Sequence, residues 1–181
     1  MYSVPIPLLQ GNPEPPLPAP VVAPPAAQIG AVCWRLRKGQ AEVLLVTSRD
    51  TGRWVIPKGW PIAGLTPQAA AEREAWEEAG VQGKISPLCL GQYCYEKLLP
   101  HQVALPCAVQ VFPLRVQSLR ASFPERQERR RKWFTAEAAS LLVAEPDLAE
   151  LLLHLSTEPQ ILAPNARRAK KARAASLHLP T

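Results

Sequence analysis

Little in this sequence suggests a disulfide scaffold, a zinc site or a membrane span. The 181 residues include four cysteines, none in a C-x-x-C pair and none with histidine at zinc-ligand spacing. This pattern predicts buried, reduced thiols. No window approaches about 18 uninterrupted apolar residues, and residues 1–10 lack the basic segment of a secretory signal. We therefore expect a cytoplasmic protein with no membrane partner.

Aromatic residues are also scarce, at 6% of the chain, although five of them are tryptophans that we expect to anchor packing or to stack on a substrate. The apolar fraction of 47% is ordinary for a soluble domain, and the length suits one domain with tails. The net charge of +6 is uneven: residues 165–181 carry +5, residues 120–132 carry +4, and the remainder is negative. These patches are compatible with contact to nucleic acid, but a solubilising tail is favoured at 165–181.

Composition divides the chain into three parts. Residues 1–27 hold nine of the 21 prolines and one charged side chain, which predicts a disordered leader. Residues 28–156 carry the periodic apolar runs of a folded domain, and 157–181 are expected to form a basic, flexible tail.

The order of the expected elements is strands, helix, strands and then helices, which predicts an α+β fold with one packed core. Pro106 and Pro113 place the strand that contains them at a sheet edge or beside bulges. The expected strands are 29–36, 41–47, 54–56, 81–97 with a break near 86–87, 103–116 and 131–134, and the expected helices are 67–79, 136–143 and 146–155.

The first expected helix carries three carboxylates on one face. Glu74, Glu77 and Glu78 stand at i, i+3 and i+4, so they lie within an arc of roughly 100°. Like charges this close repel, and near the helix C-terminus the macrodipole also disfavours them. A bound cation would reverse both penalties, and carboxylate oxygens suit magnesium or manganese. A solvated acidic face is the alternative interpretation of these three residues alone.

The wider segment, residues 59–81, resembles the Nudix box, whose pattern is G-x5-E-x7-R-E-U-x-E-E-x-G-U with U an apolar residue. Gly59 fills the first glycine, Arg73-Glu74 and Glu77-Glu78 fill the charged pairs, and Gly80-Val81 close the box. The resemblance implies a Nudix-type α/β/α sandwich with a mixed central sheet. One position departs from the pattern, because Leu65 stands where the family has its first glutamate.

The resemblance implies a pyrophosphohydrolase that binds magnesium or manganese through Glu74, Glu77 and Glu78. Glu77 or Glu78 would act as general base, and Arg73 would orient a box glutamate; a surface pair between Arg73 and Glu77 is the alternative. Glu125 and Glu128 are further candidate ligands outside the box, or else exposed charges in a basic loop. Leu65 puts the support of the metal-binding helix in doubt, more than the type of reaction.

The segment 53–60, which reads R-W-V-I-P-K-G-W, is similar to diphosphoinositol polyphosphate and dinucleoside polyphosphate phosphohydrolases, as is 129–134. This likeness implies a phosphate-rich small-molecule substrate. Arg53, Lys58, Arg130 and Lys132 are the expected phosphate-binding residues. Trp60 is expected either to stack on a base or to pack under the loop.

Two further hypotheses remain open. A weakly catalytic sensor that keeps the fold to bind a polyphosphate would account for Leu65, and an RNA-associated protein would use the two basic patches. The sequence is compatible with a monomer or a homodimer.

Overall fold

The structure is a computed structural model that describes residues 23–157. Residues 1–22 of the expected leader and 158–181 of the expected tail lie outside the described residues, so those predictions remain untested. The elements in chain order are β1 Ala26–Arg37, β2 Gln40–Thr47, β3 Trp54–Val55, β4 Lys58–Gly59, α1 Pro67–Ala79, β5 Val81–Ile85, β6 Gly91–Leu98, the short 3₁₀ turn Pro100–Gln102, β7 Ala104–Leu119, β8 Arg131–Thr135, α2 Ala136–Ser140 and α3 Pro146–Thr157.

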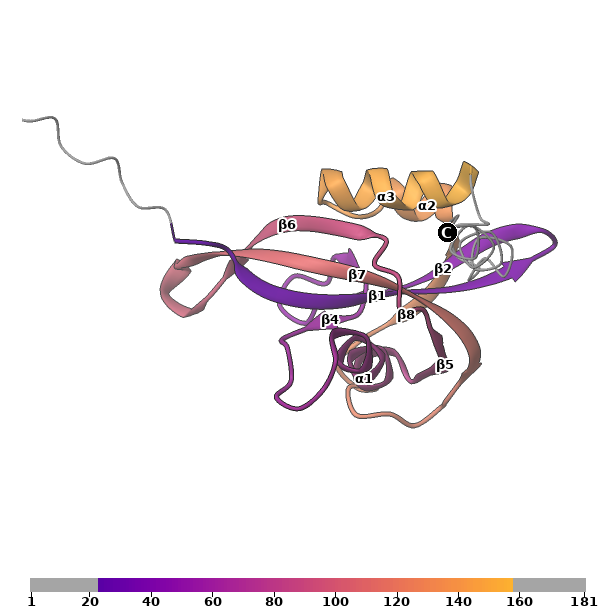
Figure 1. Cartoon of the computed structure of the whole chain (residues 1–181), viewed down its shortest axis with the longest axis horizontal. Helices are drawn as coiled ribbons and strands as arrows, with labels where there is room; N and C mark the ends of the chain where they lie inside the picture. The colour runs from indigo at the N-terminus through magenta and orange to yellow at the C-terminus, as the bar shows by residue number, and fades with distance from the viewer. Residues whose placement is uncertain (1–22, 158–181) are drawn as a thin grey trace, which may run out of the picture.

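The strands form one mixed sheet with the order β3-β2-β1-β7-β5; β4 also pairs with β1, β6 with β7, and β8 with β2. The β1–β7 pair is parallel, and every other pair is antiparallel. Helix α1 covers one face of the sheet, and α2 and α3 cover the other (Figure 1). The predicted α/β/α sandwich with a mixed central sheet is therefore confirmed.

The central strands bury side chains on both faces. Along β1, Val32 and Trp34 pack in the core beneath α2 and α3, whereas Ala31 and Cys33 pack in the core beneath α1. Successive residues of a strand point to opposite faces, so a continuous apolar run serves both layers at once. This double burial fixes the sheet as a rigid platform under the helix that carries the glutamates.

Helix α1 begins and ends where the sequence predicts. The Thr66 hydroxyl accepts a hydrogen bond from the Ala69 N–H at 3.2 Å, and Pro67 occupies the first turn. Gly80 ends the helix in the left-handed conformation, with φ of 62°. A side chain at position 80 would also collide with Phe123 and Arg131, so glycine is required there for two reasons.

Of the two expectations for the proline-containing strand, the sheet edge is wrong, because β7 pairs with β1 on one side and with β5 and β6 on the other. The expected irregularity is present in the ladder with β5, where the register shifts between Gln82 and Gly83. Pro106 pairs with β6 but precedes the first residue of the β1 ladder. The Pro113 carbonyl accepts from Ser86 at the junction between β5 and β6. Because the N–H and C=O of one strand residue point to the same side, the missing N–H of Pro113 faces that junction.

Several boundaries differ from the expected ones. Strand β1 begins at Ala26 rather than near 28, α2 ends at Ser140 rather than 143, and β4 was not expected. Cys33 and Cys107 are buried as predicted, whereas Cys89 and Cys94 are exposed, which corrects that expectation. All four thiols are free within the described part of the chain, and no helix there is long and apolar enough to cross a bilayer.

Candidate active site

A cleft of about 680 Å³ opens between α1, the loops that flank β3 and β4, the end of β6 and the loop before β8. It is lined by the three box glutamates and by Arg53 and Lys58 among the predicted residues. Arg73, Arg130 and Lys132 do not line it. The predicted ligands and two of the predicted phosphate-binding residues therefore meet at one place, and three predicted residues lie elsewhere.

Glu74 lies at the bottom of the helix face, against the backbone of Gly59. A Cβ atom at position 59 would overlap the Glu74 carboxylate, so the first glycine of the box provides the space that this side chain occupies. Within the described residues, Glu74 makes no hydrogen bond or ion pair. Burial, followed by the charges of Glu77 and Glu125, raises the pKa of Glu74.

Glu78 is buried and held from two sides. Its Oε2 accepts from the Lys58 backbone N–H at 3.3 Å, and its Oε1 accepts from Arg129 Nη2 at 2.5 Å. Burial raises the pKa of Glu78 to about 7, although the charges of Arg129 and Lys58 oppose that shift. A carboxyl group whose pKa lies near neutrality is suited to accepting a proton during catalysis.

Glu77 and Arg73 form a pair on the outer side of the same helix turn. Arg73 Nε donates to Glu77 Oε1 at 2.7 Å, and the arginine is exposed. An exposed i,i+4 pair contributes only about 0.3–0.5 kcal/mol, so it does not lock Glu77 in place. The contact is the surface pair of the alternative interpretation, and an orienting role of Arg73 stays a prediction.

Arg129, which the sequence did not single out, holds the buried carboxylates together. Its side chain is only 7% exposed, and its three nitrogens donate to Glu78, to Glu125 at 2.5 Å and to the Thr47 carbonyl at 2.9 Å. Glu125 joins the cleft lining, whereas Glu128 pairs with the exposed Arg49. The sequence feature that could have indicated Arg129 is a basic run with Glu125 four residues before it, and this feature does not distinguish Arg129 from its neighbours.

The predicted roles of Arg130 and Lys132 in the cleft are corrected by the register of β8. Arg130 lines a separate shallow hollow, and Lys132 is exposed with its Nζ 5.3 Å from the Phe134 ring centroid. Phe134 packs in the core under α2 and α3, whereas Trp133 packs in the core under α1. Alternation along the strand therefore directs Lys132 to the face away from the glutamates.

Arg53 and Lys58 form the cationic wall of the cleft. Arg53 Nη1 lies 2.8 Å from Glu145 Oε1, and the arginine remains partly exposed. Lys58 is largely enclosed, with its Nζ 5.3 Å from the Tyr95 ring centroid. Burial lowers the pKa of Lys58, and the charge of Glu78 opposes that change.

Trp60 stands at the mouth of the cleft and is 41% exposed, with Lys97 Nζ 5.0 Å from its ring centroid. It does not pack under the loop, so of the two expectations the structure leaves it open to a ligand. Leu65 is 42% exposed and makes no part of the cleft lining. The position of the missing family glutamate is thus a surface position in this chain.

The donor set fits a hard divalent cation in its chemistry, since all four candidate donors are carboxylates. Glu74, Glu77, Glu78 and Glu125 line the same cleft, and within residues 23–157 Glu74 makes no hydrogen bond or ion pair. Within residues 23–157, however, no three acidic, histidine or cysteine side chains converge as a ready-made cage. Arg73 holds Glu77, and Arg129 holds both Glu78 and Glu125, so bringing these donors together on an ion requires side-chain rearrangement.

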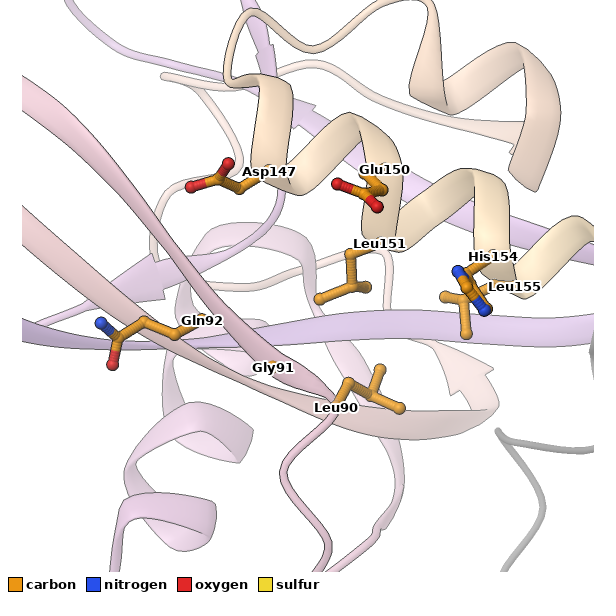
Figure 2. Close-up of a pocket in the computed structure, with 8 residues that line it drawn as sticks. All are labelled: Leu90, Gly91, Gln92, Asp147, Glu150, Leu151, His154 and Leu155. Atoms are coloured by element: carbon orange, nitrogen blue, oxygen red, sulfur yellow. The ribbon is translucent and has the colours of Figure 1, made fainter.

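A second hollow, of about 440 Å³, lies on the other face of the sheet between α3 and the start of β6. Figure 2 shows Asp147, Glu150 and His154 on the helix above Leu90 and Gly91. No lysine or arginine lines it, so its charge does not suit a phosphate-rich molecule. The cleft beside α1 is the better candidate for the active site.

Two solved structures of hydrolases with different names share the fold. Ap4A hydrolase of C. elegans matches with a TM-score of 0.54 and 23% identity, over 74% of this chain and 97% of that one. Dihydroneopterin triphosphate pyrophosphohydrolase of E. coli matches with a TM-score of 0.57 and 21% identity, over 73% and 95%. Identities this low show the fold alone.

Curated relatives are similar at the level of sequence. Nudix hydrolase 12, mitochondrial, of Arabidopsis thaliana is 36% identical over 101 residues, which are 54% of this chain and 50% of the relative. Diphosphoinositol polyphosphate phosphohydrolase 3-alpha of Mus musculus is 33% identical over 110 residues, which are 60% and 63%. The chain thus spans half to just under two thirds of these relatives. The model of the NUDIX domain matches residues 26–155, from the start of β1 to within α3, and the chain belongs to the Nudix family.

Proposed function

We propose that this chain is a metal-dependent hydrolase that cleaves a phosphoanhydride bond in an X-linked nucleoside or inositol diphosphate or polyphosphate. The observation that carries the proposal is the cleft itself, which is lined both by the glutamates of α1 and by Arg53 and Lys58. A phosphoanhydride presents oxygens that need both metal ions and fixed cations, and this cleft supplies groups for each.

Glu74, Glu77 and Glu78 are the proposed ligands for magnesium or manganese, and Glu125, which lines the same cleft, is a further candidate. Bound metal would polarise phosphoryl oxygens and lower the pKa of a water molecule. Arg53 and Lys58 would bind the phosphate oxygens, and Arg129 would hold Glu78 in place. Glu78 or Glu77 would take the proton of the attacking water.

The charges of the cleft favour a nucleoside over an inositol substrate. Arg49 and Arg129 pair with carboxylates of the cleft, which leaves Arg53, Lys58 and Lys97 to meet anionic groups. An inositol ring with phosphates on every side needs cations all around it, whereas a nucleoside polyphosphate has a neutral base. The exposed ring of Trp60 offers a stacking surface for such a base.

The test is a panel of substrates with magnesium or manganese: dinucleoside polyphosphates, nucleoside triphosphates, ADP-ribose, diphosphoinositol phosphates and capped RNA. We expect metal-dependent cleavage of at least one nucleoside substrate, and oxygen-18 water identifies which phosphorus is attacked. If every member of the panel is left intact with either metal, the proposal is wrong.

The exposed position of Leu65 keeps the weakly catalytic sensor as the second candidate function, because no glutamate at that place supports α1. Tight binding of a nucleotide without turnover would favour the sensor. Arg129 and Arg131 of the basic run both make contacts to main-chain carbonyls, which leaves fewer charges for RNA. The cytoplasmic location stays a prediction, since several relatives carry mitochondrial or chloroplastic names. The choice between monomer and homodimer stays a prediction as well.

A further inference from the structure

The three arginines that line the cleft differ in where their counter-charges lie. Arg49 lies 3.7 Å from Glu125 and 3.4 Å from Glu128, and Arg129 donates to Glu125 and Glu78. Glu125 and Glu78 line the cleft, so each of these two arginines has an acidic partner inside it. Arg53 pairs instead with Glu145, which is not part of the lining. The positive charge of Arg53 is thus balanced from behind, and its other nitrogens are left for a ligand in the cleft.

Glu145 directly precedes α3 and is only 5% exposed. Among the described residues, neither of its carboxylate oxygens accepts a hydrogen bond. Arg53 Nη1 lies 2.8 Å from Oε1, but the angles are not those of a hydrogen bond, so the contact is an ion pair. A carboxylate withdrawn from water this far is costly, and Arg53 is the cation that compensates it.

Arg53 is also restricted on its main-chain side. It immediately precedes β3, and its carbonyl accepts from the Ser48 N–H at 2.8 Å. Within residues 23–157, the Arg53 side chain donates no hydrogen bond. The main-chain bond holds the start of the side chain, and the ion pair with Glu145 holds the guanidinium at its end. Most of the five N–H groups of the guanidinium remain available to a ligand. An arginine immobilised before binding loses less conformational entropy when it meets a phosphate.

We propose that Glu145 is a positioning residue for substrate binding, which holds the Arg53 guanidinium at the cleft wall so that its remaining N–H groups meet the phosphate oxygens. The ligand chemistry is a diphosphate group. This inference rests on the proposed function for its substrate class, but the anchoring itself can be measured without catalysis. Glu145 acts through Arg53 and touches no substrate atom.

The test measures calorimetric binding of methylenediphosphonate, a diphosphate analogue that cannot be hydrolysed, in the presence of magnesium. Glu145→Gln removes the charge while keeping the shape of the side chain. We expect the Kd of this variant for the analogue to rise roughly tenfold, because the hydrogen bond from Arg53 to a phosphate oxygen is weakened. Glu150→Gln is the matched control, because Glu150 is an exposed glutamate of α3 outside the cleft, and its Kd should equal that of the unchanged chain.

A double-mutant cycle separates positioning from a general structural role. Arg53→Lys keeps a positive charge beside Glu145 but removes the guanidinium fork. If Glu145 acts through Arg53, then adding Glu145→Gln to Arg53→Lys weakens binding little further. Additive losses would overturn the proposal, as would equal Kd values for Glu145→Gln and the unchanged chain. Thermal unfolding checks each variant, and Glu145→Leu replaces Glu145→Gln if the latter does not fold.

The same experiments distinguish this inference from the proposed function. Analogue binding that depends on Glu145, with no hydrolysis of any substrate in the panel, would support the positioning role and reject the enzyme. Hydrolysis of a substrate together with unchanged binding by Glu145→Gln would support the enzyme and reject the positioning role. Absence of analogue binding by the unchanged chain would overturn the inference as well.

Discussion

At the scale of single residues, the glutamates of α1 are not equivalent. Glu74 is partly buried and has no hydrogen-bond or ion-pair partner within residues 23–157. Glu78 is buried and bonded to Arg129, and Glu77 is partly exposed and paired with the exposed Arg73. Because Glu77 loses little when it leaves that pair, it is free to bind an ion at the surface of the cleft.

Replacing Glu77 therefore separates activity from stability. We expect Glu77→Gln to lower kcat for any substrate found in the panel by roughly 100-fold or more, because it removes a carboxylate from the proposed metal site. Its melting temperature should stay close to that of the unchanged chain. Glu72→Gln, on the same helix but outside the cleft lining, is the control and should keep full activity. Equal rates for both variants would contradict the role of Glu77.

Replacing Arg129 is expected to lower stability, in contrast to replacing Glu77, because it leaves carboxylates without their counter-charge. We expect Arg129→Ala to lower the free energy of unfolding by about 3–5 kcal/mol in urea titrations. Adding Glu78→Gln should restore part of that loss, since the buried charge is then gone. A double variant that is less stable by the full sum of both single losses would argue against this coupling.

The glutamate face could be predicted from the sequence because i, i+3 and i+4 spacing determines which residues share a helix face. The partners of those glutamates could not. Arg129, Arg130 and Lys132 lie within one basic run, and their directions depend on where the turn gives way to β8 and on which strand β8 pairs with. A shift of one residue exchanges the two faces, so a local pattern does not decide which cation reaches the cleft.

At the scale of elements, α1 is positioned by its ends as much as by its packing. The Thr66 cap and the left-handed Gly80 fix the start and stop of the helix, and the glutamates occupy its last turns. Capping residues act locally, which is why both boundaries were predicted correctly. Strand β7 shows the contrary case, since the effect of its two prolines depends on where distant strands β1, β5 and β6 begin and end.

Removing the cap tests this local control. We expect Thr66→Ala to destabilise the chain by about 1 kcal/mol in urea unfolding, because the Ala69 N–H loses its acceptor. Thr66→Ser keeps a hydroxyl at the same place and should be nearly neutral. If serine and alanine cost the same, the hydroxyl does not cap α1.

At the scale of the whole molecule, residues from both helical layers of the sandwich contribute to the site. The glutamates come from α1 on one face of the sheet, whereas Arg53 is balanced by Glu145 at the start of α3, which covers the other face. The long-range pairing of Arg53 with Glu145 joins residues far apart in sequence, which no local pattern reveals.

The account depends on divalent cations binding at the glutamate face of α1, inside the cleft. Anomalous diffraction from crystals of this chain soaked in manganese tests that claim directly. We predict a manganese peak within about 2.5 Å of carboxylate oxygens of Glu74, Glu77 or Glu78, and loss of that peak in Glu77→Gln crystals. Well-diffracting crystals with no anomalous peak in the cleft, or with the same peak in both proteins, would contradict it.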